Sequence, residues 1–137
     1  MPDGDSRIFH HELCFGCGQA NLFGLQLELH SDPRGGVEGR FFVKQDHQGP
    51  PGFAHGGVLA AALDEAMALL LHAERILAVT GRIEVDFLAP APVGTFVSVR
   101  ARVLETAARK VTLEADAERG EEPVARARAT FVRQSLD

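Results

Sequence analysis

Apolar and polar residues alternate along much of the chain, which is the pattern of half-buried β-strands. The segment from Leu25 to Leu29 follows it, and we expect the first strand there. Residues 32–36, with the sequence Asp-Pro-Arg-Gly-Gly, are typical of a turn. The segment from Val37 to Val43 then reads as a second strand. Together these residues predict an antiparallel hairpin.

A long apolar stretch follows this hairpin. Residues 46–54 contain glycines and prolines that prevent regular structure, so they are expected to form a loop. From about Gly56 to Ala73, Ala, Leu, Met and Val occupy nearly every position. This composition predicts a helix that is buried on almost all sides. Such a helix needs a sheet wrapped around it.

The rest of the chain alternates again in four segments. These segments are Ile83–Phe87, Val97–Val103, Val111–Ala117 and Ala125–Phe131. Short connections between them favour an antiparallel meander, because parallel strands need longer crossovers. The order of two strands, one helix and four strands predicts an α+β fold. In this fold, a curved antiparallel sheet of about six strands wraps around one central helix.

Length and composition are those of a single globular domain. The chain has 137 residues, of which 45% are hydrophobic and 24% charged, so we expect one domain over residues 1–137. Acids interrupt the apolar stretch, which is shorter than the about 20 apolar residues of a membrane span. The acidic N-terminal residues are unlike a signal peptide, and the net charge of −5 gives no general attraction to nucleic acid or membranes. We expect a cytoplasmic protein without nucleic-acid or membrane partners.

The two cysteines of the chain, Cys14 and Cys17, form one CxxC motif. A structural zinc site usually needs four protein ligands, and His10 and His11 would be the nearest additional candidates. Adjacent histidines rarely point the same way, so the pattern favours two thiols packed under a turn, and no metal is expected. A redox role is weaker still, because the motif opens no βαβ pattern.

Two acidic residues, Asp64 and Glu65, interrupt the predicted helix. A buried carboxylate must be paired, hydrogen-bonded or near water, and the simplest interpretation is that one or both acids face solvent or a subunit interface. However, Asp64 lies on the same helical stripe as Gly57, with Gly56 one position further round. Free amides at a helix start stabilise negative charge, and glycine lets a ligand approach them. The stripe is a candidate oxyanion site, although a rise of about 12 Å from Gly56 to Asp64 favours a reaction centre shared between subunits.

The sequence His55-Gly56-Gly57, followed six residues later by Asp64, resembles the HGG-x6-D motif of hotdog-fold thioesterases of the PaaI-like group. The sequence CFGCG at residues 14–18, followed by Asn21 and Gly24-Leu25, is similar to the CxxCG…N…GL opening of many such chains. The resemblance covers nearly the whole chain, and HGG-x6-D is its most specific part.

This resemblance implies hydrolysis of acyl-CoA thioesters without a metal, in a dimer whose active sites lie at the subunit interface. Asp64 would be the general base or the nucleophile, and Glu65 beside it is a further candidate. The Gly56 amide, aided by Gly57, would polarise the thioester carbonyl, a contribution of about 3 kcal/mol. His55 would cap or position this turn. No cofactor is expected, because coenzyme A is part of the substrate.

Two further positions are assigned through the same resemblance. Many relatives have Asn or Gln six residues before the motif histidine, where this chain has Gly49, so the adjacent Gln48 is a candidate substitute. Some relatives use a Ser or Thr after the helix to hold the attacking water. Thr80 is the candidate for that role here.

Basic residues late in the chain are candidates for binding the phosphates of coenzyme A. Arg109 and Lys110, at an expected turn, are the first choice, and Arg82 is another. The alternative for each is an exposed position on a solvated sheet face.

Two other functions remain open for such a fold. One is an acyl-CoA-binding domain without turnover, and the other is a hotdog enoyl-CoA hydratase or dehydratase. In each case the unpaired edges of a six-stranded sheet predict a homodimer or a homotetramer.

Overall fold

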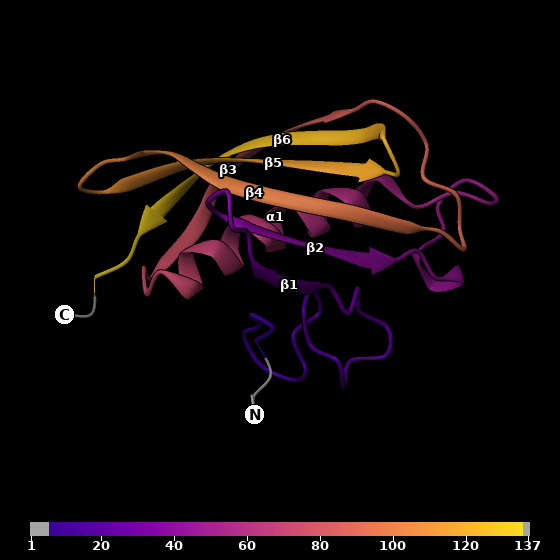
Figure 1. Cartoon of the computed structure of the whole chain (residues 1–137), viewed down its shortest axis with the longest axis horizontal. Helices are drawn as coiled ribbons and strands as arrows, with labels where there is room; N and C mark the ends of the chain where they lie inside the picture. The colour runs from indigo at the N-terminus through magenta and orange to yellow at the C-terminus, as the bar shows by residue number, and fades with distance from the viewer. Residues whose placement is uncertain (1–5, 136–137) are drawn as a thin grey trace.

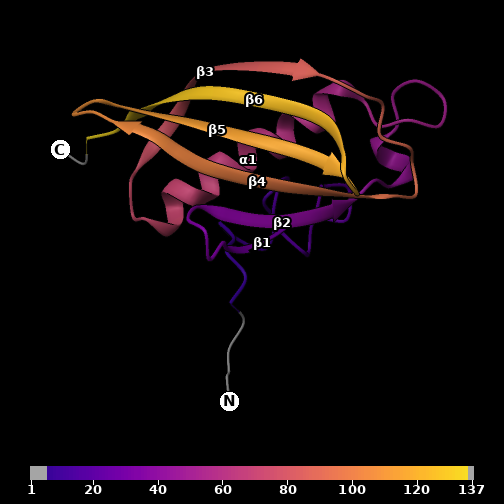
Figure 2. The same ribbon diagram turned by 45° about the horizontal axis from the view of Figure 1, so that its top comes forward.

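The computed structural model describes residues 6–135, which form one curved sheet over one long helix (Figure 1). The strands are β1 (Glu28–Ser31), β2 (Val37–Phe42), β3 (Ala78–Phe87), β4 (Phe96–Thr106), β5 (Lys110–Arg119) and β6 (Glu122–Arg133), with the helix α1 (Gly56–Ala73) and a 3-10 turn η1 (Gln45–His47). All neighbouring strands pair antiparallel. Figure 2 shows the sheet arching over α1. The predicted α+β fold, a six-stranded antiparallel sheet around one helix, is confirmed.

The strand order, β1-β2-β4-β5-β6-β3, differs from the expected meander. Strands β4 to β6 do follow one another, but β3 lies at the far edge, beside β6. The link 88–95 crosses the end of the sheet: Leu88 donates to the Val124 carbonyl of β6, and Gly94 donates to that of Val43, just after β2. An extended link of this length can span three strand spacings of about 4.8 Å, so a short connection does not require neighbouring strands. The meander prediction is wrong for β3.

The first strand begins later than the alternation predicts. Leu25, Leu27 and Leu29 are all buried, in agreement with the pattern. The amides of Leu25 and Leu27, however, donate to the carbonyls of Phe15 and Gly16 rather than to β2. Regular pairing with β2 therefore starts only at Glu28.

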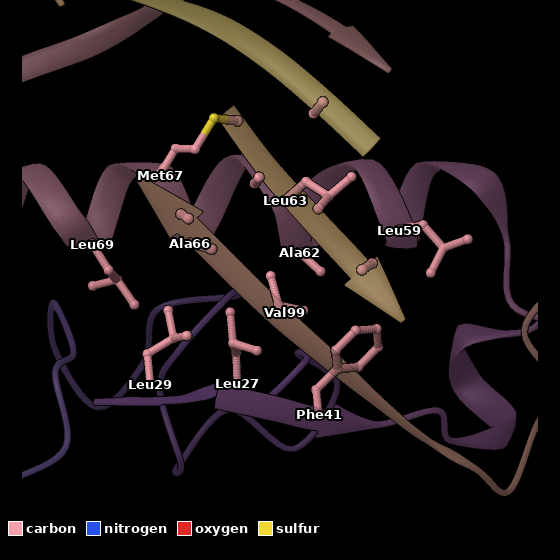
Figure 3. Close-up of a cluster of buried hydrophobic side chains, with 14 of the residues drawn as sticks. Leu27, Leu29, Phe41, Leu59, Ala62, Leu63, Ala66, Met67, Leu69 and Val99 are labelled. Atoms are coloured by element: carbon pink, nitrogen blue, oxygen red, sulfur yellow. The ribbon is translucent and has the colours of Figure 1, made fainter. Parts of the chain in front are cut away.

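The core lies between the inner face of the sheet and α1. Several inward residues of β5 and β6 are alanines that face each other across the strands, such as Ala115 with Ala127 and Ala117 with Ala125. These small side chains let the helix lie close to the sheet. In Figure 3, side chains of α1 meet others from β1, β2, β4 and the segment before β1; the labelled ones are Leu27, Leu29, Phe41, Leu59, Ala62, Leu63, Ala66, Met67, Leu69 and Val99.

Helix α1 is less enclosed than its composition predicts. Eight of its residues are buried, and these face the core. Ala61, Asp64, Glu65 and Ala68 are only half-buried, and Gly57 is exposed. The helix is long and apolar enough to span a membrane by composition alone, as core helices often are, but here it packs on all strands from β2 to β6. Its flanks remain open for other contacts.

The packing of α1 predicts a large cost for a cavity under the sheet. Leu63 is completely buried, so Leu63→Ala should lower the free energy of unfolding by about 2–5 kcal/mol. Leu22→Ala makes the same change at a side chain that is 70% exposed, and it should alter stability by less than about 0.5 kcal/mol. Urea unfolding of both variants at one protein concentration measures the difference. Equal effects would contradict this account of the core.

Candidate active site

A buried histidine fixes the loop that leads into α1. The Nδ1 atom of His47 accepts the Lys44 N–H (3.1 Å), so its Nε2 carries the proton and donates to the Gly24 carbonyl (3.1 Å). The His47 carbonyl accepts the N–H of His55 (2.8 Å). These three bonds join the loop to the segment before β1 and place His55 at the start of the helix.

His55 is the N-cap of α1. Its Nδ1 accepts the N–H of Gly57 (2.8 Å), and its carbonyl accepts that of Val58 (2.9 Å). Among residues 6–135, the Gly56 N–H donates no hydrogen bond. The helix therefore presents the Gly56 amide as a free donor, whereas the Gly57 amide is already used by the cap.

The residues before His55 are packed tightly against it. A side chain at Gly49 would meet the backbone of His55 at 2.8 Å, so this position has no space for the Asn or Gln considered from the sequence. The side-chain carbonyl of Gln48 instead accepts the Gly52 N–H (2.6 Å) across the loop. Gln48 thus braces the loop that carries the His55 cap.

The carboxylate of Asp64 contacts Thr80 on the edge strand β3. Thr80 Oγ1 donates to Asp64 Oδ1 at 2.6 Å, while Oδ2 has no hydrogen-bond partner within the described part of the chain. The strand register shifts between Thr80 and Arg82, so Gly81 forms a bulge. Thr80, expected from the sequence to hold the attacking water, is instead hydrogen-bonded to Asp64. The second oxygen of this carboxylate remains open to a ligand.

Glu65 lies apart from this pair. Its Oε2 is 3.0 Å from Nδ1 of His10 and 3.3 Å from the Sγ atom of Cys14. Successive residues of a helix point about 100° apart, so the two acids serve different flanks of α1. The structure does not place Glu65 with the catalytic candidates.

An apolar groove of about 410 Å³ opens at the start of α1. Gly56 and Leu59 of the helix form one wall, and Phe53, Phe87 and Leu88 contribute to the rest. The Gly56 amide therefore lies beside a space suited to an apolar ligand. Phe53 and Phe87 were not among the sequence candidates. The sequence features that could have indicated them are a large apolar residue in a polar loop, for Phe53, and one at the end of a strand, for Phe87.

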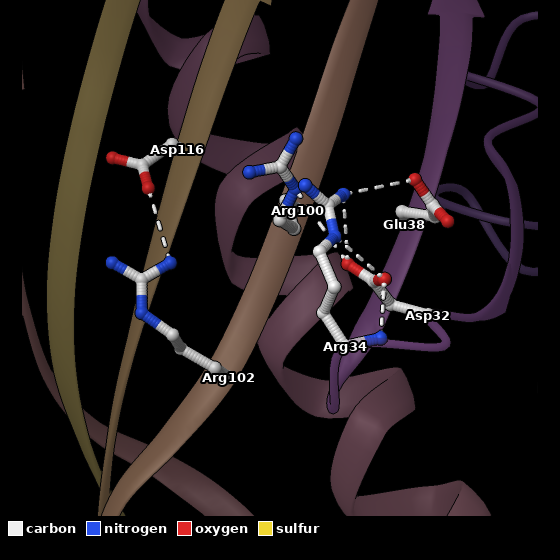
Figure 4. A network of polar contacts seen from close by, with 6 residues as sticks. All are labelled: Asp32, Arg34, Glu38, Arg100, Arg102 and Asp116. Carbon is white, nitrogen blue, oxygen red and sulfur yellow. Dashed lines mark hydrogen bonds and ion pairs between the residues drawn. The ribbon is translucent and has the colours of Figure 1, made fainter.

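The arginines of the strands lie mainly on the outer face of the sheet, where acids surround them. Figure 4 shows Asp32, Arg34, Glu38, Arg100, Arg102 and Asp116 on this face. Arg102 lies 3.2 Å from Asp116. Arg82 likewise contacts Glu84 (3.3 Å) and is largely exposed. A polar hollow of about 560 Å³ on this face is lined by residues of β1, β2, β4 and β5, away from α1.

Arg109 and Lys110 lie at the opposite end of the sheet from the Gly56 groove. Lys110 is opposite Val132, which is opposite Val79 near the start of β3. Gly56 lies beside Phe87, at the end of the same strand. Within one chain, these basic residues are therefore separated from the groove by the length of the sheet.

The sequence profile of the Thioesterase superfamily matches residues 51–126, from the loop before α1 into β6. The chain belongs to this superfamily. Its matched region includes the His55 cap, the Gly56 groove and the contact between Asp64 and Thr80. A comparison with curated proteins gave no match.

Solved structures of superfamily thioesterases share its hotdog fold. A mutant of the phenylacetic acid degradation protein PaaI from Thermus thermophilus is 30% identical over 79% of this chain and 93% of that one, with a TM-score of 0.71. A thioesterase superfamily protein is 23% identical over 77% of this chain, with a TM-score of 0.73, but only 53% of that protein is covered. A hypothetical thioesterase from Streptococcus pneumoniae, solved with coenzyme A, is 18% identical over 80% of this chain and 86% of that one, with a TM-score of 0.74.

The environment of His47 predicts that this thioesterase-superfamily protein loses stability in mild acid. Burial is the largest cause that lowers the pKa of His47, and the nearby Lys44 charge adds to it. The unfolded chain then binds a proton at His47 more readily than the folded chain does. The free energy of unfolding therefore has its full contribution from neutral His47 above about pH 6.5, and this contribution is lost as the pH falls through the lower pKa of the folded state.

Urea unfolding at about pH 7.5 and about pH 5.5 tests this expectation. The wild type should lose more stability between the two pH values than His47→Gln, which cannot titrate at this position. The same loss in both proteins would show that other groups cause the acid sensitivity.

Proposed function

We propose that this protein is an acyl-CoA thioesterase of the PaaI-like group. The observation that carries the proposal is Asp64, held by Thr80 at one oxygen and open at the other. Superfamily membership, the likeness to PaaI and the coenzyme A in the pneumococcal structure support the reaction and the substrate class. Coenzyme A is then part of the substrate, not a cofactor.

Each group in the proposed site has one task. Thr80 orients Asp64, whose open oxygen either takes a proton from the attacking water or attacks the thioester itself. The Gly56 N–H stabilises the oxyanion that forms, a contribution of about 3 kcal/mol. The carbon–sulfur bond then breaks, and in the general-base case the departing thiolate of coenzyme A takes up the proton that Asp64 removed from water. In the nucleophilic case the thiolate takes a proton from solvent, and water then hydrolyses the mixed anhydride on Asp64 to release the free acid. His55 keeps the Gly57 amide occupied and positions the turn.

The proposed site combines two subunits of a homodimer. In the described part of the chain, strand β3 has a neighbour on one side only, and Val79 and Phe87 on it, with Leu88 just after it, are about half exposed. If two copies pair through β3 in antiparallel fashion, the end of one strand meets the start of the other. The Gly56 groove of one subunit then faces Asp64 and Thr80 of the other, which resolves the about 12 Å separation along one helix.

The same pairing gives Arg109 and Lys110 a place in the proposal. They lie at the end of the sheet where β3 begins, so they are at the same end as the groove of the paired copy. At the mouth of that groove, their charges would bind phosphates of coenzyme A. Two such dimers would form the tetramer that is the other expected assembly.

Replacement of the carboxylate tests the chemistry. Asp64→Asn should lower kcat by about 10²–10⁴-fold, because the amide cannot accept the proton. Glu28→Gln removes an exposed acid of β1, at the opposite edge of the sheet from β3, and should leave kcat unchanged. Release of free thiol from a panel of acyl-CoAs measures both. Full activity in Asp64→Asn, or acyl-CoA binding by calorimetry without any hydrolysis, would refute the proposed reaction and favour a binding domain.

A charged residue on β3 tests the shared site. Val79 is 52% exposed on the edge strand, so Val79→Lys in both copies should convert a dimer to monomers and reduce activity with it. Leu104→Lys, on β4 and 40% exposed, is the matched control. Light scattering coupled to size-exclusion chromatography gives the mass. A wild type that is monomeric and active would rule out the shared site.

A further inference from the structure

A second cluster of reactive side chains lies on the other flank of α1. His10, Cys14 and Cys17 belong to the segment before β1, and Glu65 belongs to the helix. One nitrogen, two sulfurs and one carboxylate oxygen of these residues all lie within 4.8 Å of one another. No step of the proposed hydrolysis uses them.

Four of the distances between these atoms are close to those of a tetrahedral zinc site. Zinc bonds of about 2.3 Å to sulfur and about 2.0–2.2 Å to nitrogen and oxygen place adjacent ligand atoms roughly 3.3–3.8 Å apart. His10 Nδ1 is 3.6 Å from the Sγ atoms of both Cys14 and Cys17. Glu65 Oε2 is 3.3 Å from Cys14 Sγ and 3.0 Å from His10 Nδ1. Four of the six distances between the ligand atoms therefore agree with a tetrahedral zinc site to within a few tenths of an ångström.

The backbone around the cluster holds the ligands in place. The Gly18 N–H donates to the Cys14 carbonyl (2.9 Å) and closes the CxxC turn. Gly16 within this turn lies against the Glu65 side chain, where a Cβ atom would collide with the carboxylate. The N–H of His10 donates to the Sγ atom of Cys17 (3.1 Å), a bond that stabilises a thiolate. Cys17 is completely buried and the Glu65 side chain is 14% exposed.

Hydrogen bonding alone explains this convergence poorly. The pair of His10 and Glu65 accounts for two of the four groups. Thiols are weak donors and weak acceptors, so they gain little from pointing at the same ring nitrogen and carboxylate. A cation bound at the centre would contact all four ligands at once. Two sulfurs and an imidazole favour zinc over magnesium or calcium, which prefer oxygen ligands.

We propose that His10, Cys14, Cys17 and Glu65 bind one zinc ion in a closed structural site. Four protein ligands leave no position open for substrate. The ion fastens residues 8–18 to the middle of α1, and the same segment covers the edge of β1 through the Ile8 N–H, which donates to the Leu29 carbonyl (2.7 Å). The site thus stabilises both the helix flank and a sheet edge that would otherwise be free.

Metal analysis of the untagged full chain, purified under reducing conditions, tests the proposal. We expect about one zinc ion per chain by mass spectrometry. Cys14→Ser and Glu65→Gln should each retain substoichiometric zinc. His11→Gln and Glu74→Gln, which alter neighbouring residues outside the cluster, should keep the ion. Equal zinc in all five proteins would overturn the proposal.

Cobalt binding to the wild type avoids any dependence on how the variants fold. The protein stripped with a chelator should bind Co²⁺ with the absorption of a tetrahedral, thiolate-ligated ion, and Zn²⁺ should displace it. Its melting temperature should fall on stripping and return with zinc. A stripped protein that stays folded and reduced but takes up neither ion would refute the site. These measurements do not depend on thioesterase activity, so they are independent of the proposed hydrolysis.

Discussion

Helix α1 packs one side against an alanine-lined sheet, and the placement of the candidate groups on this helix depends on this contact. The facing alanines of β5 and β6 bring the helix close to the strands. Its buried leucines and methionine then fix its rotation about its own axis. Because the rotation is fixed, the Gly56 amide, the Asp64 carboxylate and the Glu65 carboxylate have defined directions.

The fixed rotation divides two adjacent acids between two tasks. Asp64 points to Thr80 on the edge strand, and Glu65 points to His10 and Cys14 in the segment before β1. A carboxylate in an apolar helix is costly without partners. Each acid therefore has its own partners. One flank of the helix can carry the proposed catalytic carboxylate, Asp64, while the other flank holds the N-terminal segment through Glu65.

The sequence predicts those features that depend on local pattern. Alternation located the strands, composition located α1, and the short acidic break in the helix pointed to Asp64. Features that depend on long-range contacts were missed. The position of β3 and the meeting of Glu65 with His10 both join residues that lie far apart along the chain. Residue spacing along one chain carries no signal for such contacts. The cap that His55 makes with the Gly57 amide is local, and the family resemblance led us to expect it.

The link 88–95, which overturns the meander prediction, also makes the proposed function physically possible. Because it crosses the sheet end, β3 is left at the edge, where Asp64 and Thr80 are reachable from outside. In a meander, β3 would lie between two strands, and pairing with a second copy through it would be impossible. The start of this link, Leu88 to Pro90, also lines the groove at Gly56. One crossing connection thus exposes the carboxylate, frees the edge for a partner and builds a wall of the groove.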